Sequence, residues 1–282
     1  MTRASGRDHH RDGYFPRKGY LMGELNYETR LRLRPHDFAI LDRFEFKNAP
    51  VGFKFLNVEA DLEGLGLERL DKRLPWCGML REAQEGRSFY ATAENQACEP
   101  GLFLTGQGPL IPIASGGRIG PAFDIYAEER ANRRVYKHVS MLAEGSTFAT
   151  AFSPVDKLTF DPDLLILGCD TLEQAERVLR ATQWDTGDPI NSRMTYVMGC
   201  NWIFTYPYVS GDINSLWTGI CHGMKKHGAF LPGLPIVSIP WHHIDRVLRN
   251  MNEMPWTMAA HTDERDEADR RGGERLGVEG II

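Results

Sequence analysis

The chain has 282 residues, of which 42% are hydrophobic and 25% are charged, and its formal net charge is −5. This composition lies in the ordinary globular range and excludes a chain that is disordered throughout. The charges are spread along the sequence rather than gathered in a basic patch, so we expect no nucleic-acid partner. The length allows one large domain or two closely packed ones.

Neither export nor membrane insertion is indicated. The first twenty residues lack the apolar stretch that a secretory signal requires. The longest apolar runs, such as Leu164 to Leu167, are far shorter than the ~20 residues needed to cross a bilayer. Five cysteines, an odd number, fit a compartment in which thiols stay reduced. We therefore expect a soluble cytoplasmic protein without disulfides and without a membrane partner.

Both ends of the chain are polar and offer little to bury. Residues 1–20 are predicted to form a flexible arm and residues 259–282 a charged tail. Between them, strand-like and helix-like segments alternate, which is typical of an α/β fold.

Runs of β-branched and aromatic residues predict the strands. In chain order these are Val51 to Val58, Ser88 to Thr92, Thr147 to Phe152, Leu164 to Leu167, Thr195 to Met198 and Ile236 to Ile239. Apolar residues three or four positions apart predict the helices. These are Tyr27 to Phe44 with a break at Pro35, Trp76 to Glu85, Ala122 to Leu142, Thr171 to Ala181 and Trp241 to Asn250.

The segment from Gly101 to Gly120 has too many glycines and prolines for a long element. We expect a loop there, which would be either a lid or ligand wall, or a plain surface connection.

Four cysteines form two pairs with equal spacing. Cys77 and Cys98 are 21 positions apart, and so are Cys200 and Cys221. Equal spacing is what an internal duplication leaves behind, although the spacing alone is only suggestive. We predict an α/β fold with a mixed sheet, built from two related halves, residues 21–150 and 151–258, that pack as one unit.

Short motifs follow one another in a distinctive order from about Pro50 to about His243. They are Pro50-Val51-Gly52-Phe53-Lys54-Phe55, Cys77 with Ala83 and Gly86, Cys98 with Gly101, Asp161-Pro162-Asp163, Cys200, Cys221 with Gly223, and Pro240. In these motifs the chain resembles a bacterial and archaeal family, the domain of unknown function numbered 169. It departs from the family pattern at Lys225, where arginine is usual, and at His222. The resemblance implies a shared fold with a recurring set of cysteines and glycines, and it implies no activity.

A duplicated fold would bring its equivalent thiols together between the halves. We therefore predict that four cysteines bind zinc or an iron–sulfur cluster, because thiolates favour these metals over magnesium or calcium. The four are Cys77, Cys98, Cys200 and Cys221. The absence of a Cys-x-x-Cys motif leaves open that they are small buried hydrophobic residues.

Two further groups of residues would contribute to such a site. A small-molecule ligand or cofactor would lie beside the cysteines, where we expect it to contact the backbone at Gly101, Gly106 and Gly223. A mixed site would instead pair Cys221 with a histidine, and of two adjacent histidines at most one would face it. The candidate histidines are His222, His227, His242 and His243.

Two alternatives stay open. One is a cysteine-dependent enzyme of small-molecule metabolism, in which Cys98 or Cys221 is the nucleophile and His222 or His138 the base. The other is an interaction or assembly protein, such as a homo-oligomer, whose subunit contact is an aromatic cluster that could equally be strand core or line a ligand pocket. This cluster comprises Trp202, Phe204, Tyr206, Tyr208 and Trp217.

Overall fold

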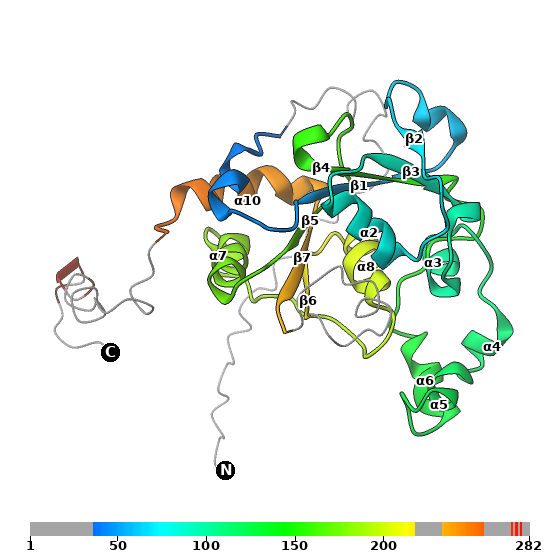
Figure 1. Ribbon diagram of the computed structural model, residues 1–282. Coiled ribbons are helices and arrows are strands. Elements are labelled where there is room, and N and C mark those ends of the chain that lie inside the picture. The colour runs from blue at the N-terminus through cyan, green and yellow to red at the C-terminus, as the bar shows by residue number, and fades with distance from the viewer. Residues whose placement is uncertain (1–35, 218–232, 257–271, 273, 276, 278–282) are drawn as a thin grey trace, which may run out of the picture. The chain divides into compact units, whose positions relative to one another are not determined.

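The computed structural model describes residues 36–217, 233–256, 272, 274, 275 and 277. Its centre is one seven-stranded sheet with the order β2-β3-β4-β1-β5-β7-β6 (Figure 1). The strands β2 and β3 pair in parallel, and the other five pairings are antiparallel. The predicted α/β class with a mixed sheet is therefore confirmed. The strands are β1 (Val51–Leu56), β2 (Glu68–Arg69), β3 (Phe89–Thr92), β4 (Ala149–Pro154), β5 (Leu164–Gly168), β6 (Asn214–Trp217) and β7 (Pro235–Pro240).

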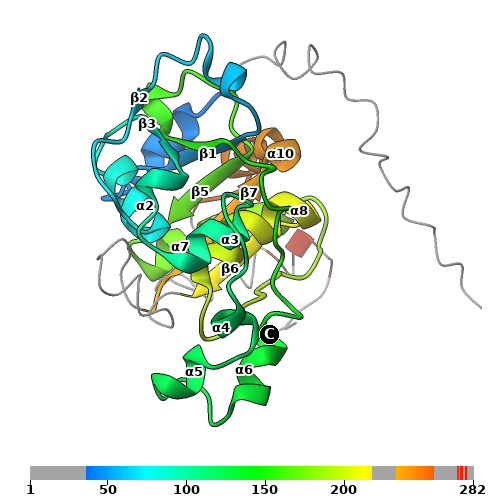
Figure 2. The same ribbon diagram turned by 90° about the vertical axis from the view of Figure 1, so that its right-hand side faces the viewer.

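Helices cover both faces of the sheet (Figures 1 and 2). One face carries α2 (Trp76–Gln84), α3 (Glu99–Leu104), the π-helix η5 (Asn201–Thr205) and α8 (Tyr206–Ser210). The other face carries the 3-10 helix η1 (Ala39–Phe44), α7 (Leu172–Gln183) and α10 (Trp241–Glu253). Short helices complete the described chain: η2 (Glu59–Leu62), η3 (Ala93–Asn95), α4 (Pro112–Ser115), α5 (Ile119–Ala122), α6 (Glu129–Val135) and η4 (Val155–Lys157). None of the described helices is both long and apolar enough to span a membrane.

Strand side chains alternate between these two layers, as the pleat requires. Phe53 of β1 faces the α2 layer, where its ring lies 5.4 Å from the ring of Trp76 and 4.8 Å from that of Phe204. Leu165 and Val237 face the other layer and pack with α7 and α10. The first layer therefore has an aromatic core that joins the central strand to α2 and η5.

Most predicted elements are present, and the exceptions have local causes. Residues Thr195 to Met198 form no strand, and Thr195 Oγ1 instead donates to the carbonyl of Val197 (2.7 Å). The aromatic run from Trp202 to Tyr208 lies on η5 and α8, because a helix also buries its aromatic side chains against the sheet. The glycine-rich segment contains three short helices rather than one loop, and the helix predicted from Ala122 to Leu142 is confined to α6.

The two predicted halves contribute strands to one continuous sheet. The strand β1 of the N-terminal half lies between β4 and β5, and β4 spans the boundary predicted after residue 150. Internal duplication therefore stays a prediction. The predicted arm, residues 1–20, lies outside the described residues, as does nearly all of the predicted tail, residues 259–282.

Candidate functional site

Two of the predicted thiols lie at neighbouring helix starts. Cys77 is the second residue of α2, and Cys98 directly precedes α3. The segments that lead into these helices run side by side: Leu74 N donates to Asn95 O (2.9 Å), and Ala97 N donates to Leu74 O (3.1 Å). This pairing holds the two cysteine-bearing backbones next to each other.

The start of η5 brings Cys200 to the same layer. Cys200 directly precedes η5, and Phe204, about one helical turn further on, packs against Trp76 with ring centroids 4.4 Å apart. Thr205 Oγ1 donates to the carbonyl of Leu104 in α3 (3.3 Å). Cys77 and Cys200 also pack against one hydrophobic cluster. The three thiols therefore lie at the N-terminal ends of α2, α3 and η5, which are linked by these contacts on one face of the sheet. Figure 2 shows α2 and α3 on this face, with α8, which continues from η5.

The backbone around Cys200 is unusual. Met198, two residues before it, has a left-handed conformation with φ of 64°, which a residue with a side chain rarely adopts. Directly after Cys200, the helix has the π form, which is rare and occurs frequently at functional sites. Such conformations persist only where the surrounding structure enforces them, and they cluster at active and binding sites.

Asn201 adds a buried donor to this region. Its side chain is fully buried, and Oδ1 accepts a hydrogen bond from Ser140 N (2.8 Å). Its Nδ2 has no hydrogen-bond partner within the described part of the chain. An unpaired buried amide costs about 1–3 kcal/mol, so this group is a ready donor for a bound atom.

Several residues of the predicted site lie in a segment outside the described part of the chain. Cys221, His222, Gly223 and His227 lie in residues 218–232, outside the described residues. Among the residues that are described, no three His, Cys, Asp or Glu side chains are placed to share a metal ion. His138 is exposed, just after α6, and its segment approaches η5 through the bond between Ser140 and Asn201.

Cys169, the fifth cysteine, lies apart from this layer. It follows β5 and is buried on the opposite face, in the cluster that contains α7 and α10. Burial, with a smaller contribution from the neighbouring charge of Asp170, raises the pKa of its thiol to about 12. Cys169 therefore stays a protonated, inert thiol near neutral pH, which makes it a control for the other four.

The predicted cofactor glycines have packing roles of their own. A Cβ at Gly101 would lie 2.6 Å from Cδ of Gln96. The Gln96 amide, oriented to satisfy both neighbours, accepts from Trp76 Nε1 (2.6 Å) and donates to Leu74 O (3.1 Å). Gly106 has φ of 73°, and a Cβ there would lie 2.5 Å from the carbonyl oxygen of Ala143. Contact of either glycine with a ligand stays a prediction.

We expect Gly106→Ala to lower the free energy of unfolding by about 2–4 kcal/mol, since it combines left-handed strain with a backbone clash. Gly145→Ala is the matched control, because Gly145 has φ of 79° and nothing within 4 Å of an added Cβ. This control should lose only about 1 kcal/mol, from the strain alone. Urea denaturation of both variants measures the difference, and equal losses would contradict the close approach of Ala143.

His242 and His243 are adjacent residues of α10. They lie near Gly211, at the C-terminal end of the helical run that begins at Cys200 and continues through α8. Their rings are 4.2 Å apart, and both approach the backbone of Gly211, which ends α8. Burial lowers the pKa of His242, and burial together with the charges of His242 and Arg246 lowers the pKa of His243 to about 4. About ten residues of helix, roughly 15 Å, separate this pair from Cys200, so both rings lie away from that thiol.

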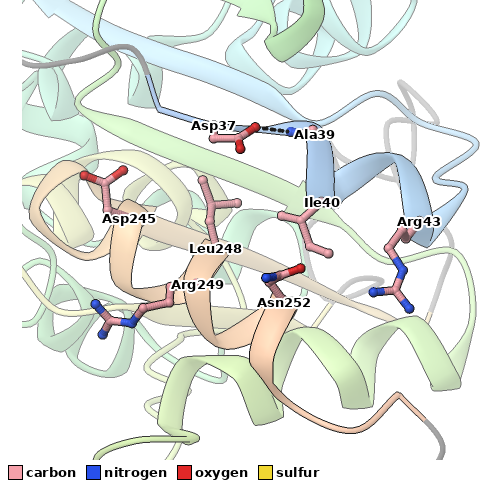
Figure 3. Close-up of a pocket in the computed structure, with 8 residues that line it drawn as sticks. All are labelled: Asp37, Ala39, Ile40, Arg43, Asp245, Leu248, Arg249 and Asn252. Atoms are coloured by element: carbon pink, nitrogen blue, oxygen red, sulfur yellow. Dashed lines mark hydrogen bonds between the residues drawn. The ribbon is translucent and has the colours of Figure 1, made fainter.

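A cavity of about 460 Å³ lies on the opposite face of the sheet, between η1 and α10 (Figure 3). Its lining combines apolar side chains with charges of both signs. The lining residues are Asp37, Ala39, Ile40, Arg43, Asp245, Leu248, Arg249 and Asn252. No sequence pattern pointed to this cavity. Met198 and Asn201 could be found in the sequence only through their position beside Cys200.

The residues from η1 into α10 match a known protein family. A family model described as "Uncharacterised ArCR", the domain of unknown function 169, matches residues 39–250. An uncharacterized protein of Methanocaldococcus jannaschii is 24% identical over 179 residues, which cover 62% of this chain and 75% of that protein. No solved structure matches the chain. The family match includes all four cysteines of the predicted thiol site.

Proposed function

Since the chain belongs to the domain of unknown function 169 family, whose description names no activity, we propose from its own geometry that it is a cofactor-binding protein. The cofactor is a zinc ion or an iron–sulfur cluster, held by thiolates of Cys77, Cys98, Cys200 and Cys221. The observation that carries this proposal is the conformation around Cys200. A left-handed Met198, a π-helix and a buried unpaired amide of Asn201 occur within a few residues of one thiol.

The chemistry of the surroundings supports a thiolate site. The first turn of a helix carries partial positive charge, which stabilises a negatively charged sulfur there. A buried N–H group beside a ligating sulfur can donate to it, and such hydrogen bonds tune the metal and its reduction potential. We expect Asn201 Nδ2, which has no hydrogen-bond partner among the described residues, to supply such a donor at this site. A reducing compartment such as the cytoplasm would keep these thiols available.

Cys221 is essential to the proposal. Among the described residues, which do not include Cys221, no three thiols are placed to share a metal ion. The fourth cysteine would complete the site, as the equal spacing of the two pairs suggests. Loss of Cys221 should therefore abolish binding as fully as loss of Cys200.

The test is the metal content of the full chain purified without oxygen. We expect stoichiometric zinc, or iron with sulfide and a visible absorption band. Serine replacements at each of the four cysteines should reduce the bound metal at least about tenfold, because each removes one of four ligands. Cys169→Ala should leave the metal content unchanged, since Cys169 lies on the other face.

A colourless, metal-free chain with folded wild-type spectra would overturn the proposal. In that case, rapid alkylation of a single thiol at neutral pH would favour the cysteine-dependent enzyme instead. Uniformly slow alkylation would favour thiols that serve only as core residues.

A further inference from the structure

A second cluster of charged side chains lies on the opposite face of the sheet, at His36. The ring Nε2 of His36 lies 3.1 Å from Oδ1 of Asp161, and its Nδ1 bonds Oδ1 of Asp245. Only 6% of the His36 side chain is exposed. Asp161 precedes β5, and Asp245 lies in α10 on the rim of the cavity in Figure 3. One imidazole ring therefore joins the segment before η1 to two other elements.

Both ring nitrogens of His36 face carboxylate oxygens, which favours the doubly protonated ring. A neutral imidazole has one N–H donor and one bare nitrogen, so it can donate to only one carboxylate, and its lone pair would face the other. The imidazolium ion has two donors and satisfies both. Burial opposes the charged ring, but its hydrogen bonds to Asp161 and Asp245, together with the negative charges of these carboxylates, outweigh burial and raise the pKa of His36 above its ordinary value of 6.5.

The other charged groups near His36 do not replace this bridge. Lys54 Nζ donates to the carbonyl of Asp161 (2.8 Å) and lies 3.7 Å from Oδ1 of Asp163, so it holds the Asp161 loop against β1. Asp37, beside His36, accepts from Ala39 N (3.1 Å) within its own segment. Arg43 and Arg249 line the cavity with Asp245, and Arg43 lies over the ring of Trp256 at 4.1 Å.

The two ends of η1 are held in different ways. At its C-terminal end, Gln174 Nε2 donates to Phe44 O (2.8 Å), and the ring of Phe44 packs on that of Trp256 at 4.7 Å. Neither contact depends on a proton that titrates near neutral pH. At its N-terminal end, Phe38 and Ile40 pack against the apolar cluster that contains α10. There the His36 ring also bonds Asp245 of α10 and Asp161 in the segment before β5, which we call the β5 loop.

We propose that His36 is a proton-dependent clamp, which fastens the N-terminal end of η1 to α10 and to the β5 loop when its ring is doubly protonated. Loss of one ring proton breaks one of the two carboxylate bonds, and this end of η1 then opens beside the cavity. Because the clamp favours the charged ring, it is fully closed below the ordinary histidine pKa and is lost as the pH rises through the higher pKa of the folded state.

Amide hydrogen exchange of the full chain at about pH 6 and about pH 9, corrected for intrinsic rates, tests this clamp. We expect exchange at Ala39 and Leu41 to be at least about tenfold faster at the higher pH, while Lys47, whose amide bonds Asp170 Oδ2 (2.7 Å), changes little. His36→Gln should exchange fast at both pH values. His138→Gln, at an exposed histidine, is the matched control and should behave like the wild type.

The variant Asp245→Asn tests the clamp without replacing His36. Asp245→Asn removes one acceptor charge at a carboxylate that is 77% exposed, so the fold should persist while the opening moves to lower pH. Titration of the His36 ring by NMR should give a pKa above 6.5 in the wild type and a lower one in Asp245→Asn. A wild-type ring that is neutral at pH 6.5, or exchange at Ala39 and Leu41 that is equal at both pH values, would overturn the proposal.

Discussion

Replacing Phe53 with alanine should lower the free energy of unfolding by about 3–5 kcal/mol, the range for removing a large aromatic side chain from a packed core. Phe53 is fully buried at the centre of the sheet, with four aromatic neighbours. Its ring centroid lies 4.8–5.4 Å from those of Phe55, Trp76, Phe152 and Phe204. The cavity cannot close easily, because these rings are themselves fixed by α2, β4 and η5.

Phe123→Ala provides the control for this prediction. The Phe123 side chain is 72% exposed, so the same truncation there should change stability by less than about 0.5 kcal/mol. Guanidinium denaturation of both variants gives the two values. A loss below about 1 kcal/mol at Phe53 would contradict the aromatic core that joins the thiol-bearing helices.

Asp163→Ala should lower the free energy of unfolding by about 2–4 kcal/mol. Asp163 is buried before β5, where its Oδ2 accepts from Phe55 N (2.9 Å) and its Oδ1 faces Lys54 Nζ at 3.7 Å. The substitution leaves a buried strand amide without its acceptor and removes the carboxylate beside a lysine. Because about a quarter of the Lys54 side chain is exposed, water still solvates its charge when the carboxylate is lost, which limits the charge contribution to the loss of stability.

Two further variants separate the amide from the charge. Asp163→Asn keeps an oxygen that can accept from Phe55 N and loses only the charge, so it should be milder by about 1 kcal/mol or more. Lys54→Met in the Asp163→Ala background removes the lysine charge and should restore part of the lost stability. Thermal denaturation measures all three, and equal losses for Ala and Asn at Asp163 would contradict the role of the Phe55 hydrogen bond.

The sequence predicted the regular elements better than the irregular ones, for a physical reason. Thr171 begins α7 as expected, because its Oγ1 accepts from Gln174 N (3.1 Å) and this contact is local. The strand predicted at Thr195 to Met198 failed, because its alternating pattern is overridden by packing around the strained Met198. Elements decided by neighbours close in sequence were predictable, and those decided by tertiary contacts were not.

In the candidate site, too, the residues could be predicted from the sequence, but their contacts in the folded chain could not. Cys77, Cys98 and Cys200 could be named from their spacing and from the resemblance. That their helices contact one another depends on Trp76 and Phe204, which are more than a hundred residues apart. The Asp161-Pro162-Asp163 motif was visible as a sequence pattern, but its partners His36 and Lys54 are equally distant. No local pattern reports such pairs, because each is created by the folding of the sheet.

A trivalent arsenical, which binds two or three nearby thiols at once, tests the central claim that cysteines of the α2, α3 and η5 layer form one site. Added to the metal-free chain without oxygen and mapped by mass spectrometry of peptides, it should join Cys200 to at least one of Cys77, Cys98 and Cys221. Cys169 should stay unmodified, because its thiol is buried on the other face and protonated. An arsenical bound to Cys200 alone, or absent from it, would contradict a shared thiol site.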